Sequence, residues 1–283
     1  EDNHVKGRVY YSAPITANAA NLPPETIDGL VAAYPPSHPK HRSAVLGKRG
    51  LNVIGMPVYG GDPERNLAPM FTRATHVRIL PYNPQLPLLT AIDFGKHHPC
   101  AVFAQYTPWG QLHLLGGVMG QNLYLEDFAP IVKRYRAEWF PTRAMDLECC
   151  DPAGAHDNSQ GVRNNGITVL RDHGFAPRWL DNSNAPDVRL AMIERMAGYM
   201  RRRTPQDEAF GIEANPARWM LVSPEAAKTW QFLADGFEAG YVWDEHMVSV
   251  GSKQMRRPKK DGWYEHAQNC CEYLELNFGG AQP

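Results

Sequence analysis

The chain contains 283 residues, 43% of them hydrophobic, which is enough for one large domain or for a domain with a smaller companion. Its formal net charge of -1 excludes a protein that binds nucleic acid through an overall basic surface, so any such surface must be local. No apolar run approaches the about 20 residues that cross a bilayer, and the sequence starts at Glu1 without an apolar leader. We therefore expect a soluble fragment whose natural N-terminus lies further upstream.

The cysteines indicate a reduced, intracellular protein. There are five, an odd number, and none has the Cys-x-x-Cys spacing that is typical of a zinc site. They are Cys100, Cys149, Cys150, Cys270 and Cys271. We expect them to be buried packing residues.

Two short basic clusters are the candidates for a local nucleic-acid surface. Such clusters either contact phosphates or form a solvated face, and the pattern alone leaves both readings open. The first cluster is Arg201, Arg202 and Arg203, and the second is Arg256, Arg257, Lys259 and Lys260.

Residues 1 to about 85 are rich in proline, which interrupts the hydrophobic pattern repeatedly and excludes a long sheet there. One helix is predicted over 24–33, because proline is tolerated in the first helical turn and Ile27, Leu30 and Val31 share one face. We interpret the region as a linker or as the tail of a preceding domain.

Strand-like runs follow the proline-rich region. They are short, apolar and rich in β-branched or aromatic residues, which predicts neighbouring antiparallel strands. These runs cover 88–95, 100–106 and 111–119. A helix capped by Asp127 is predicted to extend to about Phe140, and a further strand is predicted over 144–150.

The second half of the chain predicts helices that alternate with short strands. The predicted helices cover 162–172, 186–202, 224–238 and 263–278, and the predicted strands cover 178–180, 209–214 and 219–223. Strands followed by alternating helices and strands indicate an α/β fold with a mixed sheet flanked by helices.

Two aspartates stand where a strand is predicted to end. Asp93 ends the run AID before Phe-Gly, and Asp151 follows the strand DLECC and precedes Pro-Ala-Gly. Ligand sites of α/β proteins gather at strand ends, and divalent cations prefer oxygen ligands. Each aspartate alone is more typical of a loop or a cap, but together they predict a cation site.

The last predicted helix is a third candidate element. Glu265, His266, Asn269 and Glu272 lie three or four residues apart in several pairs, so they could share one face of that helix and point into a cleft. The alternative is an ordinary amphipathic helix whose apolar residues pack on the core while its polar residues face water.

The segments AIDFG, a β-hairpin, EDFAP, CDPAG and DGWYEHAQNCCEYL follow one another in the order found in a known family. Together they resemble the C-terminal nuclease domain of the terminase large subunit of tailed bacteriophages. NLPPETIDGLVAAY and GMPVY are similar to the stretch that leaves the ATPase domain of those proteins. The resemblance implies a ribonuclease H-like fold of the retroviral integrase superfamily, with 1–85 as the linker or tail of an ATPase domain and 86–283 as the nuclease.

The resemblance also implies an activity, hydrolysis of concatemeric viral DNA during genome packaging. In this chemistry two Mg²⁺ or Mn²⁺ ions lie about 3.5–4 Å apart, activate water and stabilise the leaving oxygen. The family's ligands fall on Asp93, which is shared by both ions, on Asp151, and on His266 with Asn269. The segment that contains Arg256, Arg257, Lys259 and Lys260 is expected to contact DNA phosphates.

Asn269 departs from the family pattern, because relatives with a His-x-x-Asp pair carry a carboxylate there. An amide oxygen is a weaker cation ligand than a carboxylate. The site could be compensated by Asp261, Glu265 or Glu272, it could carry an engineered inactivating change, or the domain could have lost activity. We expect Asn269→Asp to tighten metal binding and to speed cleavage.

The resemblance implies double-stranded viral DNA as substrate, the host cytoplasm as location, and an ATPase domain, a portal and a small terminase subunit as partners. Two other functions stay open. One is a DNA-gripping or docking module without catalysis, and the other is an actin-like nucleotide-binding domain, because Ile-Asp-Phe-Gly also resembles a phosphate loop of that class. No Gly-x-x-x-x-Gly-Lys-Ser/Thr motif occurs, so ATP hydrolysis by this chain is not expected.

Overall fold

The computed structural model divides the chain into two compact units, residues 1–54 and 55–283. The described residues are 13–34, 44–47, 55–60, 69–95, 97–108, 110–143, 145–155, 165–181, 184–201, 220–223, 231–250 and 252–279. Unit 1 contains η1 (Ile15–Asn21) and α1 (Pro24–Ala33). The helix predicted over 24–33 is confirmed, with proline at its first position.

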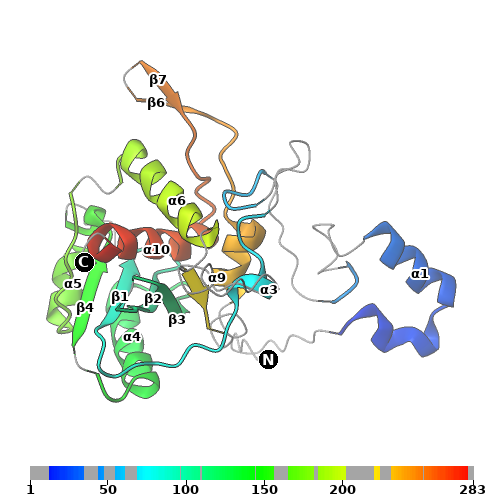
Figure 1. The fold of residues 1–283 in the computed structure, drawn as a ribbon, viewed down its shortest axis with the longest axis horizontal. Coiled ribbons are helices and arrows are strands. Elements are labelled where there is room, and N and C mark those ends of the chain that lie inside the picture. Colours follow the sequence, from blue (N-terminus) through cyan, green and yellow to red (C-terminus); the bar gives the residue numbers. More distant parts are fainter. Residues whose placement is uncertain are drawn as a thin grey trace, which may run out of the picture. The chain divides into compact units, whose positions relative to one another are not determined.

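Unit 2 is built on a mixed five-stranded sheet of order β4-β1-β2-β3-β5 (Figure 1). β2 pairs antiparallel with both β1 and β3, while β4 is parallel to β1 and β5 is parallel to β3. The strands are β1 (Leu88–Asp93), β2 (Cys100–Tyr106), β3 (Leu112–Met119), β4 (Asp146–Cys150) and β5 (Met220–Val222). The predicted α/β class with a mixed sheet flanked by helices is confirmed.

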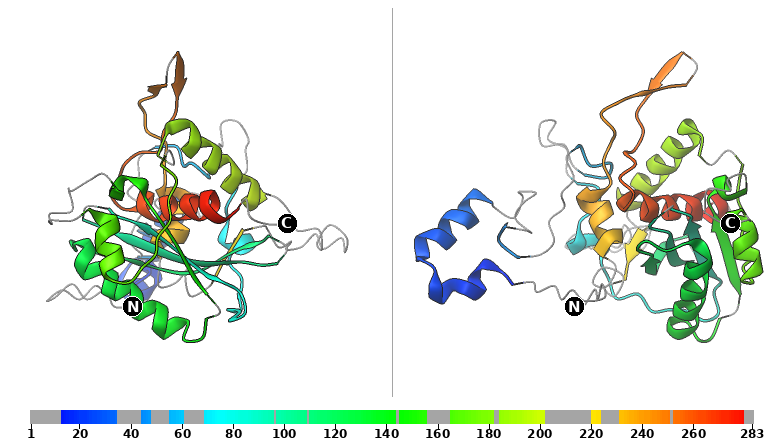
Figure 2. Two further views of the ribbon diagram at one scale, coloured as in Figure 1. Left: turned by 90° about the vertical axis from the view of Figure 1, so that its left-hand side faces the viewer. Right: turned by 180° about the vertical axis from the view of Figure 1, so that it is seen from behind.

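Helices cover both faces of the sheet, and this explains why β1 is buried throughout (Figure 1 and Figure 2). Successive side chains of a strand point to opposite faces. Leu89 and Ala91 pack in a core with α10 (Tyr264–Phe278) and α6 (Pro186–Arg201), and Leu88 and Ile92 pack with α4 (Leu125–Trp139) and α5 (Gly166–Asp172). A strand covered on both sides has no side that faces solvent, as in β1.

The five cysteines are all buried and unpaired, which confirms the packing role predicted for them. Burial raises the pKa of the Cys149 and Cys271 thiols well above their usual value, because the thiolate would lose its hydration. No described helix is long and apolar enough to span a membrane.

The start of α4 differs from the prediction. The helix begins at Leu125 after the N-cap residue Tyr124, whose side chain makes no capping hydrogen bond, and Asp127 lies in the first turn instead of capping it. Leu125 is buried in the core, so packing extends the helix by three residues, almost one turn. Asp127 still lies near the positive end of the helix dipole.

Residues 55–87, which precede β1, belong to unit 2, whereas the sequence placed the domain boundary between residues 85 and 86. Val58, Tyr59 and Phe71 are buried in the same core as α10, and α3 (Arg73–His76) follows them. Apolar side chains in irregular backbone leave no periodic pattern, so sequence periodicity could not assign them to this core. That residues 1–85 continue from an ATPase domain stays a prediction.

Three other segments differ from the prediction or lie outside the described residues. The predicted strand 178–180 is reduced to one isolated bridge between Cys149 and Arg178. In place of the end of the helix predicted over 224–238, the structure has α9 (Gln231–Asp235) and the π-helical η3 (Gly236–Gly240). Arg202, Arg203 and the strand predicted over 209–214 lie outside the described residues.

A two-stranded hairpin that the sequence pattern did not reveal projects from unit 2 (Figure 1). It consists of β6 (Val248–Val250) and β7 (Lys253–Met255), which pair antiparallel. Each of these strands has only three residues, too few to give a strand signal in the sequence.

Candidate active site

A cavity of about 450 Å³ opens where β1 and β4 end. Its lining includes residues from both strand ends, from α6, from α10 and from the segment after β7. The polar lining residues discussed below are Asp93, Asp151, Asn184, Arg189, Arg256, Arg257, Lys260, Glu265, His266, Asn269 and Tyr273.

Parallel pairing of β1 with β4 brings the two aspartates together. Ile92 pairs with Cys150, and the next backbone amide, that of Asp151, donates to the Ile92 carbonyl at 3.2 Å. Asp93 and Asp151 therefore leave neighbouring strands at the same edge. The 3-10 turn η2 (Pro152–Ala155) then carries the chain away and leaves the Asp151 carboxylate beside the cavity.

Asp93 is buried, with 3% of its surface exposed, and its carboxylate accepts three hydrogen bonds. Oδ1 accepts from the Gly95 amide at 3.0 Å and from His266 Nδ1 at 2.7 Å, and Oδ2 accepts from Asn269 Nδ2 at 2.9 Å. Burial alone would raise the pKa of Asp93, but the positive charge of His266 and these donors outweigh it and hold the pKa below its usual value. Asp93 is thus an ionised carboxylate that accepts two hydrogen bonds at Oδ1 and one at Oδ2, which leaves Oδ2 able to bind a further ligand.

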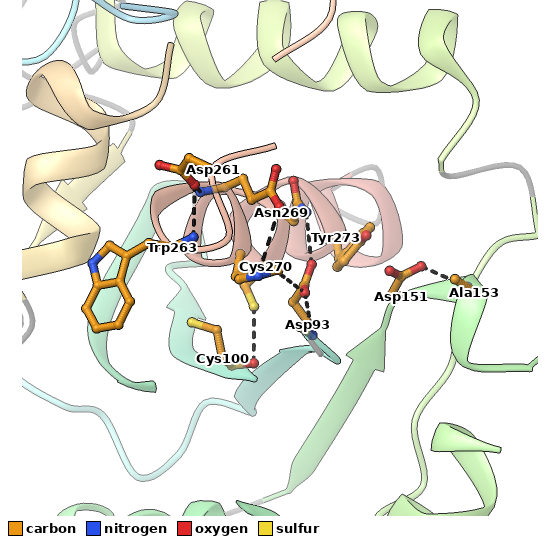
Figure 3. A network of polar contacts seen from close by, with 12 residues as sticks. Asp93, Cys100, Asp151, Ala153, Asp261, Trp263, Asn269, Cys270 and Tyr273 are labelled. Atoms are coloured by element: carbon orange, nitrogen blue, oxygen red, sulfur yellow. Dashed lines mark hydrogen bonds and ion pairs between the residues drawn. The ribbon is translucent and has the colours of Figure 1, made fainter. Parts of the chain in front are cut away.

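Asp151 is held by a different set of donors. Its Oδ1 accepts from the Ala153 amide at 2.8 Å and from Asn184 Nδ2 at 2.6 Å, and the hydroxyl of Tyr273 donates to Asn184 Oδ1 at 3.1 Å. Figure 3 shows Asp151 beside Ala153, across from Asp93. Burial and then the negative charge of Asp93 raise the pKa of Asp151. The two carboxylates repel each other, and a positive charge between them would relieve this repulsion.

His266 and Glu265 of α10 are neighbours of Asp93, and both have a raised pKa. Burial by itself would lower the pKa of His266, but the Asp93 carboxylate raises it to about 9, so the imidazole is protonated at neutral pH. Burial raises the pKa of Glu265 to about 7, against the lowering effect of His266. The Nε2 of His266 lies 4.0 Å from Glu265 Oε1. α10 thus supplies a cation and a carboxylate of shifted pKa side by side.

Asn269 points from α10 toward Asp93 (Figure 3), and its second contact is Arg189 of α6. Arg189 Nη2 donates to Asn269 Oδ1, while Asn269 Nδ2 donates to Asp93. Arginine has only donors and an ionised carboxylate has only acceptors, so this amide orientation is the one that satisfies both neighbours.

Arg189 is the functional candidate that sequence reasoning missed. Its Nε lies 3.4 Å from Glu272 Oε2, its Nη2 donates to the Tyr241 hydroxyl at 3.1 Å, and that hydroxyl donates to Glu272 Oε1 at 2.7 Å. Burial by itself would lower the pKa of Arg189, but its interactions with Tyr241 and Glu272 raise that pKa well above its usual value, so the guanidinium is permanently charged. Only the helical segment 186–202 was predicted here, and one arginine within it carried no further signal.

The basic segment after β7 borders the same cavity. Arg256, Arg257 and Lys260 line it, and all three are exposed, whereas Lys259 is exposed but is not part of the lining. Arg257 Nε also donates to Asp244 Oδ2 at 3.1 Å. Three of the four predicted phosphate contacts therefore lie beside the two aspartates.

The donor set fits one divalent cation better than two. Among the described residues, no three or more His, Cys, Asp and Glu side chains form a ready-made metal site. The carboxylates of Asp93 and Asp151 suit a divalent cation that relieves their repulsion. Asn269 does not suit one in this arrangement, because its oxygen accepts from Arg189 and its amide group faces Asp93.

Comparison with known proteins gives matches only among solved structures; no protein-family model and no curated protein matches the chain. The large terminase from a thermophilic bacteriophage, in its crystal form 2, matches with a TM-score of 0.50 and 14% identity over 92% of this chain and 53% of that chain. Crystal form 3 of the same terminase matches with a TM-score of 0.50 and 12% identity over 90% and 53%. The fold is that of a phage large terminase. The chain spans about half the length of the thermophilic phage protein.

A further match is the nuclease domain of the large terminase from bacteriophage SPP1, solved with bound Mn, at a TM-score of 0.35 and 12% identity over 68% of this chain and 87% of that chain. The predicted relationship to the terminase large subunit is confirmed by the thermophilic phage structures at the level of the fold. Within this large terminase fold, Asp93, Asp151, His266 and Asn269 line one cavity.

Proposed function

We propose that this chain is the DNA-cutting domain of a phage large terminase, a divalent-metal-dependent endonuclease that cleaves concatemeric viral DNA during packaging. One observation carries the proposal. Asp93 and Asp151 leave adjoining parallel strands at one edge and line a cavity that exposed basic residues border. The fold shared with the large terminase of the thermophilic phage supports the packaging role.

Asp93 and Asp151 would hold Mg²⁺ or Mn²⁺, and the bound ion would lower the pKa of a water molecule and stabilise charge on the scissile phosphate. His266 then serves as a positioning residue. Its Nδ1 holds Asp93 Oδ1 and directs the Asp93 carboxylate, while Asn269 holds the other oxygen. The expected ligand role of Asn269 is replaced by this positioning role.

DNA would approach along the basic segment. Arg256, Arg257 and Lys260 would contact backbone phosphates, which carry no base information, so cleavage should be largely sequence-tolerant. The whole terminase would act in the host cytoplasm together with its ATPase domain, a portal and a small subunit.

The test is plasmid nicking in Mn²⁺ and in Mg²⁺ by the chain and by Asp93→Asn and Asp151→Asn. We expect each substitution to lower nicking by at least about 100-fold, because each removes one negative ligand from the cation. Asp93 is buried and hydrogen-bonded, so circular dichroism must show that the variant is folded. The control is Asp172→Asn, an exposed carboxylate at the end of α5. Nicking that persists in folded variants would refute the proposal.

A DNA-gripping module without catalysis is the second candidate, and the neutral Asn269 paired to Arg189 favours it. Metal-dependent nicking separates the two functions, because a gripping module binds DNA with or without Mn²⁺ and leaves it intact. An actin-like domain would instead bind ATP in an equilibrium binding assay.

A further inference from the structure

Arg189 places a permanent positive charge in the cavity wall next to the two aspartates. Its guanidinium reaches from α6 to Asn269, Tyr241 and Glu272, and its side chain is only 17% exposed. It belongs to the same cavity lining as Asp93 and Asp151. A second cation close to this guanidinium would meet a like charge in a partly desolvated site, which is costly.

Asn269 reinforces this arrangement. Its oxygen, the atom that could bind a cation, accepts from Arg189. Turning the amide over would place its NH₂ group against the guanidinium and its oxygen against the Asp93 carboxylate, two unfavourable contacts. The Asn269 amide therefore accepts from Arg189 and donates to Asp93, and its oxygen is not available to a second ion.

Arg189 also keeps donors for a ligand. Its Nε and Nη2 contact Glu272, Tyr241 and Asn269, while its Nη1 has no hydrogen-bond partner among the described residues and is not among the buried unsatisfied atoms. A guanidinium held on one side and open on the other is suited to a phosphate oxygen, since arginine matches the geometry of that group.

We infer that Arg189 takes the place of a second metal ion: one divalent cation, held by Asp93 and Asp151, works together with a guanidinium that binds an oxygen of the DNA phosphate. This inference rests on the proposed nuclease function and adds to it a one-cation stoichiometry and a phosphate-binding residue. Arg189 stabilises the negative charge of the phosphate through a fixed, preorganised donor.

The first measurement is a calorimetric titration of the chain with MnCl₂. We expect one Mn²⁺ per chain. Asn269→Asp introduces a carboxylate oxygen beside Asp93 Oδ2, in place of an amide that now lies 2.9 Å from it, and the added negative charge favours a cation bound to Asp93. Because Arg189 stays beside this position, the variant should bind its Mn²⁺ more tightly and should still bind one per chain.

The second measurement removes the guanidinium. Arg189→Met should lower plasmid nicking about 100-fold, the scale for loss of one transition-state donor, yet tighten Mn²⁺ binding by about threefold to tenfold because a like charge is gone. A merely structural role would weaken both. Arg189→Lys keeps the positive charge, so its Mn²⁺ affinity should stay close to that of the wild type. If Arg189→Met does not fold, Arg189→Met with Glu272→Gln removes the unpaired carboxylate as well.

The matched control is Arg195→Met. Arg195 lies on the same helix and pairs with Glu275 of α10 at 3.5 Å, but it is 57% exposed and does not line the cavity. Its loss should change neither nicking nor Mn²⁺ binding.

The outcomes separate the two proposals. Two Mn²⁺ per wild-type chain, or weaker Mn²⁺ binding in Arg189→Met, would overturn the one-cation inference while the nuclease function stands. No Mn²⁺ binding by the wild-type chain, together with nicking that Asp93→Asn leaves intact, would overturn the nuclease function itself.

Discussion

At the scale of single residues, the site depends on which hydrogen-bonding atoms already have a partner. Asp93 receives three donors and Asp151 receives two, so the carboxylates are oriented before any ligand arrives. Such partners behind metal ligands direct the ligand lone pairs and commonly change affinity when they are removed. Asn184 and His266 are the two partners whose effect can be measured directly.

Asn184→Ala should weaken Mn²⁺ binding by about tenfold, the lower end of the range for the loss of a residue that supports a metal ligand. Asn184 donates to Asp151 at 2.6 Å, and without this donor the pKa of Asp151 should rise further. The affinity loss should therefore grow as the pH falls. Calorimetric titration at several pH values measures it, with the exposed Gln121→Ala as control. Equal affinity in Asn184→Ala at every pH would contradict the positioning role.

His266 should make the metal-free protein less stable at alkaline pH. Its folded pKa of about 9 lies above the usual 6.5, so the stabilisation by Asp93 is complete below about pH 6.5 and is lost as the pH rises through about 9. Urea unfolding across this range should show a falling free energy of unfolding, and His266→Gln should flatten the curve. The exposed His246→Gln should leave it unchanged. A curve that keeps its slope in His266→Gln would show that the shift has another origin.

At the scale of elements, the site lies where four segments converge. The parallel ends of β1 and β4 supply the carboxylates, α10 and α6 supply the groups that hold them, and the segment after β7 supplies exposed positive charge. Each element carries its residue on the face or at the end that points to the cavity. The segment after β7 is the element whose proposed role is purely electrostatic.

Neutralising Arg256 and Lys260 to Gln should weaken binding to unrelated DNA sequences equally. Each phosphate contact contributes about 0.9 to the slope of log K against log salt, so the slope should become shallower by about 1.8. Arg257 is left in place because it also pairs with Asp244. The control neutralises Arg134 and Arg171, exposed residues on the helices of the opposite face. An unchanged slope would make the segment after β7 a solvated loop.

At the scale of the whole molecule, unit 2 closes its core with residues that precede the first strand. Phe71 stacks on Phe237 with ring centroids 5.3 Å apart, and Tyr59 lies 5.6 Å from the same ring. This core supports α10, the helix that carries His266 and Asn269. Substitutions in the core residues that precede β1 should therefore affect the site by destabilising unit 2.

Phe71→Ala should cost about 3–5 kcal/mol of unfolding free energy, as for other buried aromatic side chains replaced by alanine. Denaturant unfolding measures the loss. Ile79→Ala is the control, since Ile79 is 89% exposed and should change stability by no more than about 0.5 kcal/mol. If Phe71→Ala unfolded like the wild type, residues ahead of β1 would be a linker after all.

The sequence alone determined the regular elements and the two carboxylates. Apolar runs of strand length gave β1, β2 and β3, helical spacing gave α1, α6 and α10, and the position of Asp93 and Asp151 after apolar strands gave the edge at which they meet. These features depend on local periodicity and on turn residues, which a sequence displays directly.

The tertiary structure alone decided what surrounds the carboxylates. Arg189 is one arginine on a helix until α6 packs against α10 and presents it to Asn269, and only that contact fixes which way the amide points. The core role of Phe71 likewise exists only once distant segments meet. Local pattern determines which elements form, whereas the occupancy of each donor and acceptor depends on partners far away in the chain, and that occupancy decides whether Asn269 binds a metal ion or holds Asp93.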